Sequence, residues 1–241
     1  MGDSPPGSTV AFLPGFMQHG DSWTPVADRV RERYPSIRVD FETWTFEGRL
    51  REIARVCPPG SVVVGYSMGG RLALHAAVRE PERFAALAVV GASAGIEDPD
   101  ERRERRAADD SLARWMEGAP IEEVVARWEA LPPFATQPPA LVASQRPGRL
   151  AHDPAALARL LRSAGQGALP SLWDRLERLE QPVLAVAGEL DARYAEVAQR
   201  MAALLPRGAA ALVPGAGHAP QLERPEASAA LLLEFFDQHF G

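Results

Sequence analysis

The chain has 241 residues, of which 46% are hydrophobic, and a formal net charge of -6. This length and composition predict one α/β domain with room for one insertion and argue against two equal domains. No basic stripe alternates with aromatic residues, and no apolar run approaches the roughly 20 residues of a membrane span, so the sequence argues against a nucleic-acid partner or a membrane protein. We therefore expect a soluble, cytoplasmic protein.

The sequence contains a single cysteine, Cys57. An internal disulfide is therefore excluded, and the lack of a second thiol or a His/Cys cluster argues against structural zinc. We interpret Cys57 as a small apolar residue at a helix end. All 26 basic residues are arginines, so the presence of an arginine at a given position is weak evidence for function.

The first part of the chain alternates between predicted strands and helices. Residues 1–8 are rich in Gly, Ser and Pro and are expected to be disordered or extended. After them, the hydrophobic pattern predicts strand 9–13, a helix from Trp23 to about Tyr34, strand 37–41, helix 47–56, a central β-branched strand from residue 61, helix 71–78 and strand 87–93.

The alternation then breaks between about Gly95 and Leu179. This stretch contains proline-rich joints and predicted helices at 100–116, 121–130, 153–164 and 171–179, without a convincing strand. Alternation resumes with strand 181–188, helix 192–205, strand 209–213 and helix 225–240. We expect an open, mostly parallel sheet flanked by helices, with residues 1–94 and 180–241 as the core and 95–179 as a helical cap, because long insertions of this kind usually cover active sites.

A glycine-flanked serine lies between the central strand and the helix that follows it. Gly65-Tyr66-Ser67-Met68-Gly69 matches the G-x-S-x-G nucleophile elbow, in which glycines let the strand and the helix pass closely while the serine occupies a strained turn. The start of a helix also favours developing negative charge. The competing interpretation, a Ser/Gly-rich helix cap, leaves the doubled glycine after Met68 unexplained. Ser67 is therefore the candidate nucleophile or base.

An elbow of this kind works with an oxyanion hole built from two backbone N–H groups. One belongs to the residue after the serine, here Met68, and the other comes from the loop after the first strand. In this chain that loop begins Pro14-Gly15-Phe16, so the N–H of Phe16 is the second candidate.

A serine needs an imidazole to take its proton and a carboxylate to orient that imidazole. His218 directly follows the last predicted strand, whereas His19, His75, His152 and His239 have interpretations as surface or packing residues. Asp191 follows the penultimate strand and completes the order Ser, Asp, His that the elbow fold uses. Glu189 is the competing carboxylate, and either residue could instead serve as a helix N-cap.

With these residues assigned, the chain resembles the α/β-hydrolase superfamily. Within it, the chain is similar to the 2-succinyl-6-hydroxy-2,4-cyclohexadiene-1-carboxylate (SHCHC) synthases of menaquinone biosynthesis. The elbow and the histidine loop are common to the whole superfamily. The arginine-bearing segments are the ones that distinguish these synthases from other members. The segments that carry the resemblance are 65–71, 101–105, 126–134, 161–167 and 215–218.

The resemblance implies a lyase that binds a substrate with several carboxylates and eliminates pyruvate. It further implies that Ser67, activated by His218, removes a substrate proton, and that the enolate-like charge is stabilised by the N–H groups of Phe16 and Met68. No metal or organic cofactor is implied. Arginine suits carboxylates because its planar fork binds them bidentately. By resemblance, carboxylates are bound by Arg71, Arg105 and Arg162, with Arg102 as the alternative to Arg105, while Tyr66 and Trp128 line the pocket.

Two departures from the superfamily pattern bear on the substrate. Pro14-Gly15 stands where His-Gly is usual, and the loop after the second strand is shorter than expected. The alternative function is a serine carboxylesterase or thioesterase that acts on a small acidic ester. A non-catalytic binding module is disfavoured by the complete set of Ser67, Asp191 and His218. The sequence leaves open whether the protein is a monomer or a homo-oligomer.

Overall fold

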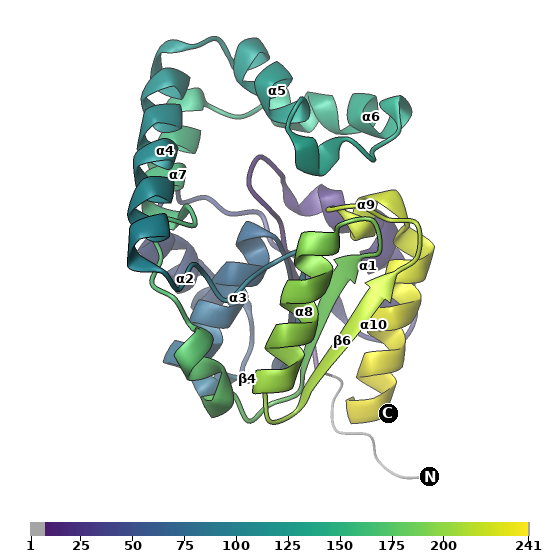
Figure 1. The fold of residues 1–241 in the computed structure, drawn as a ribbon. Helices are drawn as coiled ribbons and strands as arrows, with labels where there is room; N and C mark the ends of the chain where they lie inside the picture. Colours follow the sequence, from purple (N-terminus) through teal and green to yellow (C-terminus); the bar gives the residue numbers. More distant parts are fainter. Residues whose placement is uncertain (1–7, 241) are drawn as a thin grey trace.

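A parallel sheet forms the centre of the computed structural model, which describes residues 8–240 (Figure 1). Residues 1–7 of the predicted unstructured segment lie outside the described residues. The sheet order is β2-β1-β3-β4-β5-β6, and every neighbouring pair is parallel. The α/β fold with a parallel central sheet is thus confirmed. The strands are β1 Val10–Leu13, β2 Ser36–Arg38, β3 Ser61–Tyr66, β4 Phe84–Val90, β5 Val183–Gly188 and β6 Gly208–Val213.

Helices cover both faces of this sheet, so that β1, β3 and β5 are buried on both sides, while the edge strands β2 and β6 are partly exposed. Successive side chains of a strand point to opposite faces, so Val62 and Val64 join one apolar core while Val63 joins the other. The core that contains Val62 is closed by α1 Thr24–Arg31 and α10 Pro225–Phe240. The opposite core is closed by α2 Phe46–Val56, α3 Met68–Arg79 and α8 Ala192–Leu204.

The connections change direction between β1 and β3. The chain leaves β1 for β2 at one edge of the sheet and then returns to place β3 on the other side of β1. In open α/β sheets, ligands bind beyond the carboxyl ends of the strands at such a switch point. The loop that contains Phe16 and the turn that contains Ser67 both start there, because they follow β1 and β3 directly.

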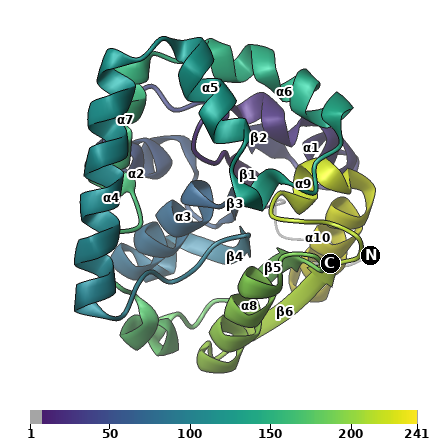
Figure 2. The ribbon, with the colours of Figure 1, turned by 45° about the horizontal axis from the view of Figure 1, so that its top comes forward.

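Helices from the segment between β4 and β5 lie over the carboxyl ends of the strands (Figure 1). Viewed from that end, they form an arc around the strand ends (Figure 2). The long helices α4 and α7 pack against each other, and α5 packs against α6. Their bounds are α4 Pro99–Gly118, α5 Ile121–Glu129, α6 Pro139–Leu150 and α7 Pro154–Ala164, followed by a 3-10 helix at Trp173–Arg178.

Several predicted elements differ from the observed ones. The sequence prediction missed α6 because Pro147 lies inside it, where a proline usually interrupts a helix. The predicted helix 171–179 is only the 3-10 helix Trp173–Arg178. Strand β4 begins at Phe84, three residues before the predicted start. It ends at Val90, earlier than predicted, because Gly91 leaves extended backbone with a φ of +56°. Strand β2 is shorter than predicted, and the four-residue helix α9, Pro220–Glu223, was not predicted.

Cys57 caps the carboxyl end of α2 and is fully buried. Burial raises the pKa of its thiol to about 11. The interpretation of Cys57 as a small apolar residue at a helix end is thus confirmed. Among the described residues, no helix is both long and apolar enough to cross a membrane.

Candidate active site

The turn between β3 and α3 holds Ser67 in an unusual backbone conformation. Its φ of +49° and ψ of -107° lie outside the regions that a serine normally adopts. Close contacts explain the neighbouring glycines: a Cβ at Gly70 would lie 2.6 Å from the Cβ of Ala92, and a Cβ at Gly69 would overlap the carbonyl oxygen of Leu13. The strained turn expected of a nucleophile elbow is therefore present, and it is stabilised by the packing of α3 against β1 and β4.

Asp191 and His218 come from the ends of β5 and β6 and form a hydrogen bond. Nδ1 of His218 donates to Oδ2 of Asp191 across 2.7 Å, and both side chains are largely buried. Oδ1 of Asp191 also accepts from the backbone N–H of Tyr194, so Asp191 caps α8 as well. Burial by itself would raise the pKa of the Asp191 carboxyl, but the hydrogen bond from His218 and its charge outweigh burial and lower the pKa below its ordinary value.

The competing carboxylate, Glu189, has a different position. Its Oε2 accepts from the backbone N–H of Gly215 across 2.8 Å at an exposed site. The carboxylate beside His218 is therefore that of Asp191. Glu223, from the unpredicted helix α9, accepts from the N–H groups of Gly217 and Ala219, the two neighbours of His218. This buried carboxylate thus fixes the loop that carries the imidazole.

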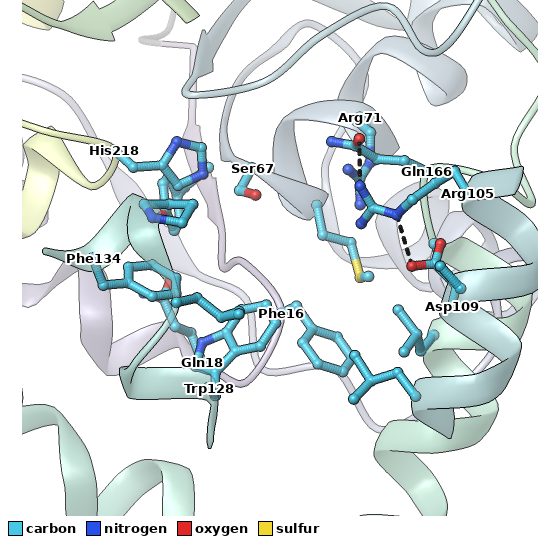
Figure 3. A pocket seen from close by; sticks show the side chains of 18 of the residues that line it. Phe16, Gln18, Ser67, Arg71, Arg105, Asp109, Trp128, Phe134, Gln166 and His218 are labelled. Carbon is cyan, nitrogen blue, oxygen red and sulfur yellow. Dashed lines mark hydrogen bonds and ion pairs between the residues drawn. The ribbon is translucent and has the colours of Figure 1, made fainter. Parts of the chain in front are cut away.

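Ser67 and His218 line one cavity of about 470 Å³ beyond the strand ends (Figure 3). Within residues 8–240 no hydrogen bond joins the Ser67 hydroxyl to His218. The other lining residues are Phe16, Gln18, Tyr66, Met68, Arg71, Arg105, Ala108, Asp109, Leu112, Arg127, Trp128, Leu131, Pro133, Phe134, Arg149, Leu161, Gly165, Gln166, Arg193 and Tyr194.

Phe16 and Met68 both border this cavity. In the described part of the chain, neither backbone N–H donates to a protein acceptor, so both are free to bind a ligand oxygen. The loop that carries Phe16 is held by two hydrogen bonds, from the Gly15 N–H to the side chain of Gln18 and from the Trp23 indole to the carbonyl of Leu13. These bonds fix the loop although Pro14 stands in the position where histidine is usual.

Arg71 is the most deeply buried cation of the cavity that lacks an acidic partner. Its residue is 7% exposed, and no carboxylate lies within ion-pair distance among the described residues. Nη2 donates to the carbonyl of Ala164 across a long 3.4 Å, and Nε has no acceptor within the described chain. Burial lowers the pKa of Arg71 from its ordinary value. A buried, incompletely paired guanidinium favours an anionic ligand.

Arg105 also lines the cavity, whereas Arg102 does not. Nε of Arg105 forms an ion pair with Asp109 on the same helix, and Nη1 donates to the side-chain oxygen of Gln166. Tyr66 and Trp128 line the wall of the cavity, as the resemblance implied, and the ring of Trp128 packs against Phe16 with centroids 5.1 Å apart.

The structure does not bring Arg162 into the cavity. This side chain leaves α7 toward α4, where its guanidinium pairs with Glu117 and approaches Asp110 at the protein surface. The prediction that Arg162 binds a carboxylate of the ligand therefore conflicts with its position. The neighbouring residue Leu161 faces the cavity instead, because adjacent positions of a helix point about 100° apart.

Sequence reasoning missed Arg149, which lines the cavity and is 3% exposed. It lies on α6, the helix hidden by Pro147, and Nη1 donates to Glu129 across 3.0 Å. Tyr194 and Gln166 were also missed as individual cavity residues. Tyr194 follows Asp191 by three positions, which places it on the first turn of α8 and is a usable signal. Within residues 8–240, no cluster of three or more His, Cys, Asp or Glu side chains could hold a metal ion.

Comparison with known proteins matches residues 10–231 to the model of the alpha/beta hydrolase family. A 2-succinyl-6-hydroxy-2,4-cyclohexadiene-1-carboxylate synthase from Yersinia enterocolitica is 30% identical over 96% of this chain and 88% of its own length. A Bacillus subtilis protein provisionally named as the same synthase is 37% identical over 72% of this chain, and the match spans 64% of its length.

One solved structure is similar over nearly the whole chain. The structure of MenH from S. aureus superimposes with a TM-score of 0.91 and 29% sequence identity, covering 97% of this chain and 95% of that protein. The similarity therefore includes the segment between β4 and β5 as well as the sheet.

Proposed function

The chain belongs to the alpha/beta hydrolase family, and we propose that within this family it acts as a lyase that eliminates pyruvate from a polycarboxylated cyclohexene substrate. The product would be SHCHC, an intermediate of menaquinone biosynthesis. The similarity to SHCHC synthases supports this assignment. The expected cytoplasmic location belongs to the same proposal.

The observation that carries the proposal is the charge of the cavity. Arg71 is buried on the first turn of α3, four residues after Ser67, without an acidic partner in the described chain. Hydrolysis of a neutral ester needs no such cation, whereas a substrate carboxylate would pair with it. Arg105 and Arg149 supply further positive charge from the helices above, although each is already paired with an acid.

In the proposed reaction, Asp191 keeps the His218 imidazole oriented so that its Nε2 can take the Ser67 proton. Ser67 then removes the acidic proton of the substrate, and the N–H groups of Phe16 and Met68 stabilise the enolate-like negative charge. The bond between the ring carbon and the oxygen of the enolpyruvyl substituent breaks as the ring diene forms. The enolate that leaves takes the proton held by His218 and becomes pyruvate, so that His218 is neutral again. Residues 95–179 would act as the cap that excludes water from this chemistry.

The test is an assay of pyruvate release from the synthase substrate. The Ser67→Ala variant is expected to lose at least about a thousandfold in kcat, because removing one member of a triad has an effect of this size. The expected control is an unchanged melting temperature. Rapid hydrolysis of short nitrophenyl esters by the wild-type protein, without pyruvate release, would instead assign it as a serine hydrolase.

A further inference from the structure

Gln166 links two residues that line the cavity, Arg105 and Tyr194. It follows α7, and its residue is 8% exposed. Its Oε1 accepts from Nη1 of Arg105 on α4 across 3.1 Å (Figure 3), and its Nε2 donates to the hydroxyl of Tyr194 on α8 across 3.0 Å. This largely buried amide therefore connects the helices above the cavity to the core helix that follows Asp191.

The polarity of this chain of hydrogen bonds is dictated by chemistry. A guanidinium can only donate, so the oxygen of the amide must face Arg105. The NH2 group then faces Tyr194, because the reversed amide would place donor against donor. The Tyr194 oxygen consequently accepts from Gln166, and its own proton must point elsewhere.

The Tyr194 proton has no acceptor among the residues that the structure describes. Tyr194 lines the same cavity as Arg71 and Ser67, and its ring packs on His218 with centroids 4.7 Å apart. We propose that Gln166 orients the Tyr194 hydroxyl as a hydrogen-bond donor to a carboxylate oxygen of the substrate. Tyr194 is then a binding residue, and Gln166 is a positioning residue that acts through it.

A carboxylate is the appropriate acceptor because the same cavity contains Arg71 without an acidic partner in the described chain. A carboxylate has room for about four hydrogen bonds, so a guanidinium can fill one side while a neutral hydroxyl fills another. The identity of this ligand rests on the proposed function; the polarity of the hydrogen bonds does not.

The first test measures substrate binding in the Ser67→Ala variant, which cannot turn the substrate over. Adding Tyr194→Phe removes only the hydroxyl and is expected to raise the dissociation constant roughly tenfold or more, the usual effect of losing a hydrogen bond to a charged group. Tyr34→Phe is the matched control, because it removes a hydroxyl that donates to Asp237 away from the cavity. An unchanged dissociation constant in the Tyr194→Phe variant would overturn the proposal.

The second test reverses the polarity with Gln166→Glu. A carboxylate at this position can accept from both Arg105 and Tyr194, so it would take the tyrosine proton away from the substrate. Tyr194→Phe should then have little further effect in the Gln166→Glu background. If Tyr194→Phe raises the dissociation constant equally in both backgrounds, Gln166 does not orient the hydroxyl, and that part of the proposal is wrong.

The two proposals fail in different ways. If Tyr34→Phe in the Ser67→Ala background binds the substrate but Tyr194→Phe binds it equally well, the donor role of Tyr194 is wrong while the proposed function stands. If the wild-type protein neither binds the substrate nor releases pyruvate, the proposed function fails and the carboxylate ligand of Tyr194 fails with it. Circular dichroism melting of each variant separates loss of binding from loss of the fold.

Discussion

Arg71 and Arg162 lie in opposite surroundings, although the family resemblance implies that both bind a substrate carboxylate. Arg71 is buried in the cavity without an acidic partner in the described chain, whereas Arg162 lies at the surface and pairs with Glu117. An exposed pair of this kind contributes little to stability, but a buried charge that lacks a partner has a cost in the free protein. A cost of this kind is typical of functional sites, where the ligand supplies the missing charge.

Replacing Arg71 should therefore affect binding more than folding. The Arg71→Met variant is expected to raise the KM for pyruvate release by about tenfold to a hundredfold, because a charged hydrogen bond to the substrate is lost. Its free energy of unfolding should be unchanged or higher, since no intact ion pair is broken. The matched control is Arg162→Ala, for which we expect a wild-type KM. Equal KM values for the two variants would remove Arg71 from the binding site.

His75 provides a test of pH dependence away from the cavity. It is buried on α3 against Phe46, and burial lowers its pKa to about 4. The unfolded chain binds a proton at this residue below about pH 6.5, while the folded chain resists it until about pH 4. The free energy of unfolding therefore decreases as the pH falls from about 6.5 to about 4, by up to about 3 kcal/mol in total.

The measurement is the free energy of unfolding in urea at pH 7 and at pH 4.5. The His75→Gln variant keeps a polar side chain that cannot be protonated, so it should lose less stability between the two pH values than the wild type. His152 also has a pKa lowered to about 4 by burial and remains in both proteins, so the difference between them isolates His75. Parallel pH profiles would show that His75 binds a proton as readily in the folded chain as in the unfolded one.

At the scale of single elements, the position of α3 depends on the glycines in its first turn, which have no side chain. Gly69 approaches the carbonyl oxygens of Leu13 and Pro14 so closely that a methyl group would collide with backbone. Backbone cannot rotate away as a flexible side chain can. The close packing of Gly69 against the loop after β1 also directs Ser67 toward the cavity. The same contact therefore fixes both the start of α3 and the turn that carries Ser67.

Gly69→Ala is consequently expected to destabilise the protein by about 3 kcal/mol or more, or to prevent folding. Gly118→Ala is the control, because that glycine ends α4 with nothing within 4 Å of its added methyl group, and alanine there should stabilise by about 0.4–1 kcal/mol. Urea unfolding of both variants checks the contrast. Similar stabilities would contradict the close packing described for α3 against β1.

At the scale of the whole molecule, the sequence predicted the residues that follow strands better than those on the inserted helices. Ser67 and Asp191 follow the fully buried strands β3 and β5, and His218 follows the edge strand β6. Parallel strands end at one edge of the sheet, so local pattern and topology sufficed to group these residues. The rotation of α4, α6 and α7 about their axes is set by packing between helices, which no local pattern records. Arg162 was misplaced for that reason, whereas Arg149 was missed because Pro147 hid the helix α6 that carries it.

The buried thiol of Cys57 makes the protein convenient for spectroscopy. Cys57 precedes β3, at the amino-terminal edge of the sheet and far along the strands from the cavity, and its high pKa leaves almost no reactive thiolate at neutral pH. A maleimide dye should therefore not react with Cys57 in the folded protein. One cysteine introduced on the exposed surface of α4 would be labelled selectively, so motion of the inserted helices during turnover can be followed without first mutating the natural thiol.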